Sequence, residues 1–158
     1  MKKLITLSAL LIPFLGIAQK TPLQFKHTEY TTASPASIWK IWTDVPNWKQ
    51  WDDGLKDATL RGAFAVGAKG KLTPDKGPKA KFFIASLSEG KSYIFKTRIP
   101  FGFLVITRTL TTENERTAFT HEVSFTGLLK KPFARSLGKR YQGMLPVAMR
   151  KIKAIAEQ

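Results

Sequence analysis

After residue 54, apolar and polar residues alternate in short runs that are separated by turn residues. Alternation with a period of two is typical of half-buried strands. The pattern predicts a first strand at 23–32 and six later strands, at 58–61, 70–73, 80–87, 92–99, 103–111 and 117–126. Because the connections between the later strands are short, consecutive strands must pair as antiparallel neighbours.

Two short helices are predicted after the first strand. Ser34 and Pro35 are typical of a helix start, because a serine side chain caps free backbone N–H groups and proline fits the first turn. Pro46 should end this helix, since an interior proline removes a backbone hydrogen bond. A second helix is expected over 47–51.

The last part of the chain has helical periodicity. From Pro132 to about Ala156, apolar residues recur at spacings of three and four and form one continuous stripe. Pro146 lies inside this segment and predicts a kink or a division there. A sheet that buries the stripe must curl around it. The sequence therefore predicts an α+β fold, in which a curved antiparallel sheet of about seven strands wraps around a long C-terminal helix.

The first 18 residues have the order of an export signal: Lys2 and Lys3, then an apolar run, then Gly16-Ile17-Ala18. We expect cleavage after Ala18, a single domain over 19–158, and a periplasmic or secreted protein. The apolar run is short for a membrane span, which needs about 20 residues. An uncleaved membrane anchor is the competing interpretation.

Composition narrows the classes of function. There is no Cys and only 2 His, and no His-x-x-x-His or Glu-x-x-His motif, so we expect neither a metal site nor a cofactor. The formal net charge is +15, with basic groups in 69–81 and 130–140. This charge favours polyanions or anionic lipid, and export makes nucleic acid the least natural partner. A solvated surface with no specific partner is the alternative.

One polar pair is predicted on the inner face of the sheet. If Asn114-Glu115 is the tip of the last hairpin, Arg108 lies opposite His121 among apolar neighbours such as Phe119. A buried arginine needs a partner. A shifted register, or an arginine at the sheet rim, would remove the pair. No acidic side chain falls on this face, and we expect His121 to be neutral at pH 7.

The same reasoning adds further residues to the candidate site. If Phe101-Gly102 is the tip of the preceding hairpin, Phe95 lies opposite Arg108. Trp51 could line a pocket mouth or belong to the core, and the face of His27 stays undecided. On the last helix, the apolar stripe that faces the expected pocket includes Tyr141, Met144 and Leu145. The predicted ligand-binding residues are Arg108, His121, Phe95, Phe119, Trp51, Tyr141, Met144 and Leu145.

Three segments resemble a known family. They are 34–39 (SPASIW), 42–51 (WTDVPNWKQW) and 116–123 (RTAFTHEV), with Gly127 after the last. They are similar to the START-like superfamily, also called SRPBCC or polyketide cyclase/dehydrase type, and the resemblance spans about residues 25–157. It implies the helix-grip fold. It does not imply a reaction, because this superfamily contains cyclases, lipid carriers, hormone receptors and chaperone partners.

Three functions remain open. The first is binding or carriage of a small hydrophobic ligand, with or without an anionic head, by a monomer outside the cytoplasm. The second is a cyclase/dehydratase-like enzyme, with His121 as general base and Arg108 stabilising negative charge. The third is a basic module that binds polyanions or membrane surfaces weakly. Neither the ligand nor the partner can be named from the sequence.

Overall fold

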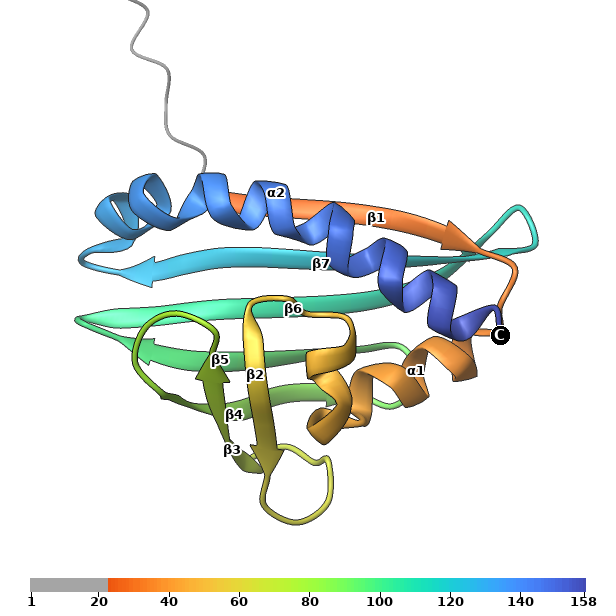
Figure 1. The fold of residues 1–158 in the computed structure, drawn as a ribbon, viewed down its shortest axis with the longest axis horizontal. Coiled ribbons are helices and arrows are strands. Elements are labelled where there is room, and N and C mark those ends of the chain that lie inside the picture. The colour runs from red at the N-terminus through yellow and green to blue at the C-terminus, as the bar shows by residue number, and fades with distance from the viewer. Residues whose placement is uncertain (1–22) are drawn as a thin grey trace, which may run out of the picture.

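The computed structural model describes residues 23–158. The predicted signal segment 1–18 lies outside the described residues. The elements are β1 (Gln24–Thr31), α1 (Pro35–Thr43), the 3-10 helix η1 (Val45–Gln50), β2 (Leu55–Leu60), β3 (Lys69–Pro74), β4 (Ala80–Ser88), β5 (Ser92–Ile99), β6 (Gly102–Glu113), β7 (Arg116–Gly127) and α2 (Lys130–Ala156) (Figure 1).

The described strands form one antiparallel sheet of seven strands in the order β1-β7-β6-β5-β4-β3-β2. Consecutive strands pair from β2 to β7, and β1 closes the far edge against β7. Helix α2 lies across the concave side, where it packs chiefly on β1, β7 and α1 (Figure 1). The predicted α+β fold, a curved sheet around a long C-terminal helix, is therefore confirmed.

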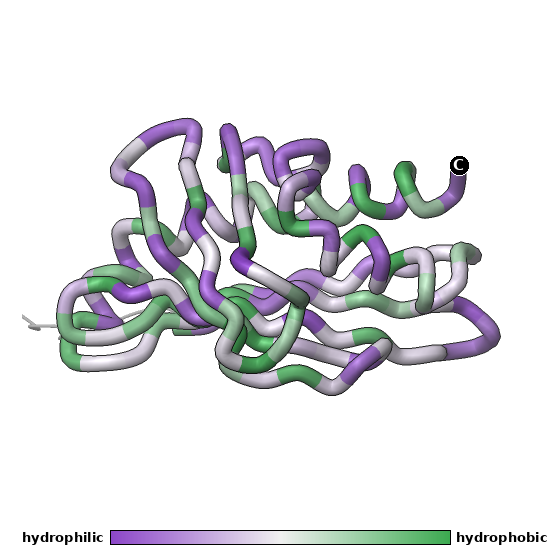
Figure 2. The backbone as a smooth tube through the Cα atoms, turned by 90° about the horizontal axis from the view of Figure 1, so that it is seen from below, coloured by the Kyte–Doolittle hydropathy of each residue, from purple (hydrophilic) through white to green (hydrophobic). Residues whose placement is uncertain are grey.

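Alternation along the strands produces the core. On β7, Phe119, His121, Val123 and Phe125 are buried on the concave face, whereas the alternate residues Thr120, Glu122 and Ser124 are partly exposed. Figure 2 shows hydrophobic and hydrophilic stretches alternating along the strands and around α2. The space that α2 leaves above β4 and β5 is filled by η1, whose Trp48 packs on Phe82 and Phe95 with ring centroids 5.6 and 5.3 Å apart.

The first helix starts as expected and ends earlier than expected. The side chain of Ser34 accepts a hydrogen bond from the backbone N–H of Ser37 at 3.1 Å. Helix α1 ends at Thr43, however, and Pro46 lies in the first turn of η1. The prediction that Pro46 ends α1 is therefore wrong. Pro46 belongs to the start of the next helix, where proline is tolerated.

The C-terminal helix is longer than predicted and undivided. It begins at Lys130, two residues before Pro132, and continues through Pro146 to Ala156. Figure 1 shows that the axis of α2 changes direction along its length. Of the two outcomes expected at Pro146, division of the helix is wrong, because packing on the sheet holds the segments on both sides of the proline in one helix.

One hairpin register is confirmed and the other is wrong. Between β6 and β7, Glu113 pairs with Arg116 and Arg108 pairs with His121, as predicted. Between β5 and β6, Ile99 pairs with Gly102, so the turn is Pro100-Phe101 and not Phe101-Gly102. Every pair is displaced by two residues. Tyr93, rather than Phe95, therefore lies opposite Arg108, while the inner face of each strand is unchanged.

Candidate functional site

Arg108 and His121 occupy opposed positions on the concave face, and each side chain is only 3% exposed. Their neighbours along the same face, Ile106, Leu110 and Phe119, are buried and apolar. The register argument that placed two polar residues on an apolar face is thus confirmed, and neither residue lies at an exposed rim. An arginine removed from water in this way must be stabilised by its surroundings.

Aromatic rings surround the guanidinium group. Its Cζ atom lies 4.7 Å from the ring centroids of both Trp48 and Trp51. The rings of Tyr93 and Phe95 follow at 5.3 and 5.6 Å. A cation over an aromatic face is stabilised by about 0.5–2 kcal/mol. We call Arg108, His121, Tyr93, Trp48 and Trp51 the Arg108 cluster.

A hydrogen-bonded chain connects Arg108 to the end of α1. Arg108 Nη1 donates to the hydroxyl of Tyr93, which in turn donates to the carbonyl oxygen of Trp42 at 3.0 Å. Trp48 Nε1 donates to the same carbonyl at 2.9 Å. This carbonyl is free because the residue four positions later is Pro46, which has no N–H to complete the helical bond. The proline thereby creates the acceptor that orients Tyr93 and Trp48.

An acidic group that the sequence did not place on this face lies beside the cluster. Asp52 follows η1 and accepts a hydrogen bond from the backbone N–H of Gly54 at 2.9 Å. Burial raises the pKa of Asp52, whereas the Gly54 N–H and the charges of Arg108 and Arg140 oppose that rise. The Asp52 carboxylate thus caps the turn 52–54 and also interacts electrostatically with Arg108.

Several buried nitrogen atoms in the Arg108 cluster and in the adjacent Trp42 have no hydrogen-bond partner within residues 23–158. They are Arg108 Nε, His121 Nε2, Trp51 Nε1 and Trp42 Nε1. Arginine and tryptophan nitrogens can only donate, so three of the four require an acceptor. Buried donors without an acceptor are rare and costly, at about 1–3 kcal/mol each. The concave face therefore presents a group of donors to whatever acceptor reaches it.

His121 does not readily become protonated beside the positive charge of Arg108. Its ring stacks on Trp42 at a centroid distance of 5.4 Å. Burial first, and then the nearby charge of Arg108, hold the pKa of His121 well below its usual value of 6.5. The expected neutral imidazole agrees with this direction. Burial also raises the pKa of the Tyr93 hydroxyl to about 12, so it remains protonated as a donor to Trp42.

The other predicted site residues surround the cluster at different depths. Phe119 is fully buried and packs edge-on against Trp42, with 6.3 Å between ring centroids. Leu145 is 7% exposed and belongs to the core. Tyr141 is partly buried, and burial raises its pKa to about 12 with a contribution from Asp52.

Met144 lies over the turn that carries Asp52. A Cβ atom added to Gly54 would come within 2.6 Å of Met144 Cε, so the turn and α2 are in close contact. A second link between them is the exposed ion pair of Lys151 with Asp53. The structure thus brings Tyr141 and Met144 towards the polar end of the face, whereas Phe119 and Leu145 lie within the core.

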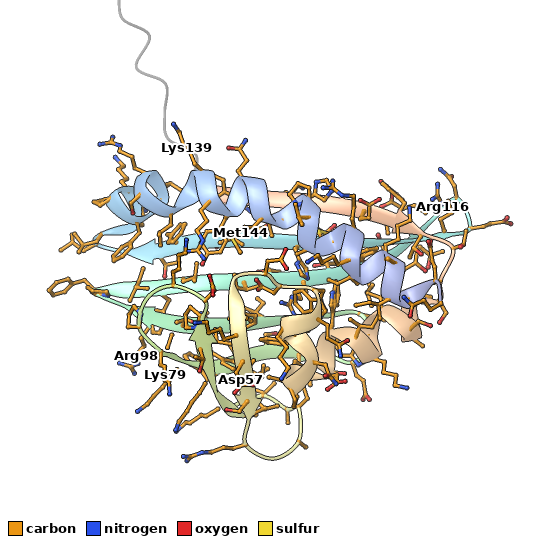
Figure 3. All side chains as sticks on the ribbon, in the orientation of Figure 1. Asp57, Lys79, Arg98, Arg116, Lys139 and Met144 are labelled. Atoms are coloured by element: carbon orange, nitrogen blue, oxygen red, sulfur yellow. The ribbon has the colours of Figure 1, made fainter. Side chains whose placement is uncertain are left out.

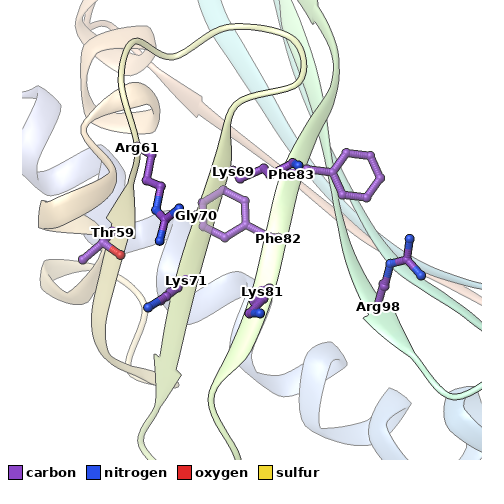
Figure 4. A pocket seen from close by; sticks show the side chains of 9 residues that line it. All are labelled: Thr59, Arg61, Lys69, Gly70, Lys71, Lys81, Phe82, Phe83 and Arg98. Carbon is purple, nitrogen blue, oxygen red and sulfur yellow. The ribbon is translucent and has the colours of Figure 1, made fainter.

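Two hollows of the described chain lie away from the predicted pocket. One, of about 510 Å³, opens on the outer side of β2 to β5 (Figure 4). The other, of about 320 Å³, lies between α1, η1 and the end of α2, and Trp51 is among its lining residues. Neither is lined by Arg108, His121 or Tyr141. The side chains of the Arg108 cluster, which include Trp48 of η1 and Trp51 after it, are buried and pack against one another.

His27 lies on β1 directly opposite His121, and its Nε2 is 3.7 Å from Glu29 Oε2. Among residues 23–158, no three His, Asp or Glu side chains are grouped as metal ligands would be. None of the described helices is both long and apolar enough to span a membrane.

No family model matches the sequence, and no curated protein matches it either. Solved structures do match in fold. A protein from Mesorhizobium loti shares 16% identity over 85% of this chain and 96% of its own, with a TM-score of 0.68. The di-domain ARO/CYC StfQ of the steffimycin biosynthetic pathway has a TM-score of 0.69 at 12% identity, over 85% of this chain and 50% of its own.

DynU16, from the dynemicin biosynthetic locus, has a TM-score of 0.66 at 15% identity, over 87% of this chain and 48% of its own. This chain thus spans about half of each of these two biosynthetic proteins. At such identities the likeness concerns the fold. Together with the sheet order and the position of α2, it shows that this chain has the helix-grip fold, which the sequence resemblance to START-like (SRPBCC) proteins implied.

Proposed function

We propose that this protein binds a small, largely apolar molecule with an acidic head, and that the head is held by Arg108. The observation that carries the proposal is the buried guanidinium, whose Nε atom has no acceptor within the described chain. A carboxylate or phosphate would accept from Nε and neutralise the charge. A hydrogen bond of this charge-assisted kind contributes about 1.5–3 kcal/mol.

The protein groups around Arg108 stabilise it only in part. Tyr93 supplies one neutral acceptor, and the rings of Trp48 and Trp51 supply cation–π contacts. Asp52 interacts electrostatically with Arg108, but burial raises the pKa of Asp52 and no hydrogen bond joins it to the guanidinium within the described residues. An anion is therefore bound more favourably at this site than it would be in a core made of apolar residues alone. The aromatic rings beside Arg108 can pack against the apolar part of the same ligand.

Access to the site requires a movement of side chains at the turn 52–54. Met144 from α2 is in close contact with Gly54 there, and Arg140 Nη2 would lie 3.7 Å from a Cβ atom at that position. Methionine and arginine are long, flexible side chains that can change rotamer without moving the backbone. In this proposal they separate to admit the ligand, whose apolar part then displaces the contacts between the turn 52–54 and α2.

We also propose that binding takes place outside the cytoplasm. The support is the charged, apolar and small-residue order of residues 1–18. A protein of this kind would carry its ligand in an exported compartment and would act as a monomer.

A second candidate is a cyclase-like enzyme. The specific observation in its favour is that His121, with a depressed pKa, lies directly opposite Arg108. A neutral imidazole can accept a proton while the guanidinium stabilises the negative charge that develops. The fold likeness to StfQ and DynU16 supports this class without choosing a substrate. Turnover of the bound molecule, lost in His121→Gln, would distinguish an enzyme from a carrier.

Native mass spectrometry of the protein purified from its own cell envelope tests the proposal. We expect an acidic molecule of low mass to accompany the wild-type chain and to be absent from Arg108→Met. The matched control is Arg116→Met, which removes an exposed arginine at the start of β7. An adduct that is neutral, or that accompanies Arg108→Met equally, would contradict the proposal.

A further inference from the structure

Two large apolar side chains protrude together at one end of the molecule. Phe101 is 75% exposed in the β5–β6 turn, and Leu128 is 81% exposed just after β7. Their backbones are joined, because Leu128 N–H donates to Phe101 C=O at 3.1 Å. Figure 1 shows this turn and the start of α2 at the same end of the sheet.

The backbone at Phe101 is unfavourable for phenylalanine. Its φ angle is +56°, in the left-handed region. A two-residue turn that begins with Pro100 and has positive φ at the second position is best filled by glycine or asparagine. Phenylalanine there is strained and gains no core contact in return, so turn formation does not explain its presence.

Cations surround this pair. Lys130 and Lys131 follow Leu128 and form the first turn of α2, which has no acidic residue. Positive charge is the unfavourable sign at a helix N-terminus, so helix stability does not explain these lysines. On β5, Arg98 lies 5.9 Å from the ring of Phe103, and no Asp or Glu occurs in residues 91–112 or 123–156.

The basic surface continues into the outer hollow of about 510 Å³. Arg98 lines it on the side of the hairpin, and Figure 4 shows the remaining lining residues. Its cationic residues are Arg61, Lys69, Lys71, Lys81 and Arg98, and it contains no acidic residue. None of these five forms an ion pair within residues 23–158. We call Arg98, Phe101, Leu128, Lys130 and Lys131 the docking end, and the hollow the basic cleft.

We propose that the docking end binds the surface of a bilayer containing anionic lipid. In that complex Phe101 and Leu128 insert below the head groups, and the surrounding cations contact lipid phosphates. A soluble polyanion would satisfy the charges but would leave both apolar side chains in water. A bilayer interface satisfies both, since it offers an anionic surface over an apolar layer. This proposal does not depend on a ligand at Arg108.

Flotation with lipid vesicles provides the test. Vesicles of phosphatidylcholine with or without phosphatidylglycerol are mixed with the full chain, with Phe101→Asn/Leu128→Ser, and with the control Val147→Ser. Asparagine tolerates the positive φ of position 101, so the double variant should keep its fold. Val147 is 37% exposed in α2, away from the docking end. All chains carry the same N-terminal segment, so differences between them report on the docking end.

We expect the wild type and Val147→Ser to bind vesicles that contain phosphatidylglycerol. The double variant should bind these vesicles at least about ten-fold more weakly. Arg98→Gln should weaken binding more than Arg116→Gln, which lies at the opposite end (Figure 3). Heparin should bind the wild type and the double variant equally. Vesicle binding by the double variant at wild-type strength, or no preference for anionic lipid, would overturn the proposal in favour of a soluble polyanion or a solvated surface.

Discussion

Arg108 on β6 and Tyr93 on β5 lie directly opposite each other, and the guanidinium donates a hydrogen bond to the phenol oxygen. The same hydroxyl donates to the Trp42 carbonyl at 3.0 Å. Tyr93 thus joins the sheet, the buried cation and the end of α1.

Tyr93→Phe should therefore destabilise the fold. The substitution leaves Arg108 without its one protein acceptor and removes one of the two donors to Trp42. We expect the free energy of unfolding to fall by about 1–3 kcal/mol in chemical denaturation. The matched control is Tyr30→Phe, whose exposed hydroxyl donates to Glu113 and whose loss should change stability by no more than about 0.5 kcal/mol. Equal effects of the two substitutions would mean that the buried chain contributes nothing.

The depressed pKa of His121 predicts a dependence of stability on pH. The unfolded histidine takes up a proton as pH falls through about 6.5, whereas the folded one resists it, so stability is lost below that pH. The raised pKa of Asp52 acts with the opposite sign. Compared with His121→Gln, the wild type should lose up to about 1.4 kcal/mol more per pH unit between pH 6.5 and 5. If the unfolding free energies of the two proteins changed with pH in parallel, the pH dependence could not be assigned to His121.

Two glycines of α2 test how the helix sits on the sheet. A Cβ at Gly138 would come within 2.2 Å of the ring of Phe25 on β1, whereas a Cβ at Gly143 would meet nothing within 4 Å. Gly138→Ala should destabilise by about 1–3 kcal/mol through overpacking. Gly143→Ala should stabilise by about 0.5–1 kcal/mol, because alanine favours the helix. Thermal denaturation of both variants measures this contrast. Two changes of the same sign would contradict the described packing of α2 on β1.

Export is tested by N-terminal sequencing of protein from the cell envelope. Cleavage after Ala18 should leave Gln19 at the N-terminus, because the small residues before it match what a signal peptidase recognises. An intact Met1 in the envelope fraction would favour the anchor instead.

Local patterns were sufficient to predict much of the fold. Strand alternation and the stripe of α2 located every element to within a few residues, and the Asn114-Glu115 tip fixed the register of β6 and β7. Both tip residues have positive φ, 48° and 61°, which matches the right-handed twist of a hairpin. That register placed Arg108 opposite His121.

The β5–β6 register was missed because Gly102 was assigned to the turn. In the structure Gly102 belongs to β6, where an added Cβ would lie 1.9 Å from the carbonyl oxygen of Thr126. Glycine is needed there for the close approach of two strands, and the positive φ falls on Phe101 instead. The two-residue displacement hid Tyr93 as the partner of Arg108.

The remaining site residues depend on tertiary contacts that the chain order does not reveal. Asp52 reaches the cluster because η1 folds over β4 and β5, and the Trp42 carbonyl is available because Pro46 follows four residues later. The one available signal was the Trp42–Pro46 spacing, which predicts an unpaired carbonyl wherever a proline follows a helical residue by four positions.

The central claim is that Arg108 selects an acidic head on an apolar ligand. The most direct measurement compares the affinities of a fluorescent fatty acid and its methyl ester for the wild type, Arg108→Met and the control Arg116→Met. The wild type and Arg116→Met should prefer the acid by about ten-fold or more, since a charge-assisted hydrogen bond distinguishes the two. Arg108→Met should lose this preference while its stability stays equal or rises, because an incompletely paired buried charge is removed. Equal binding of acid and ester by the wild type, or a preference that survives in Arg108→Met, would contradict the claim.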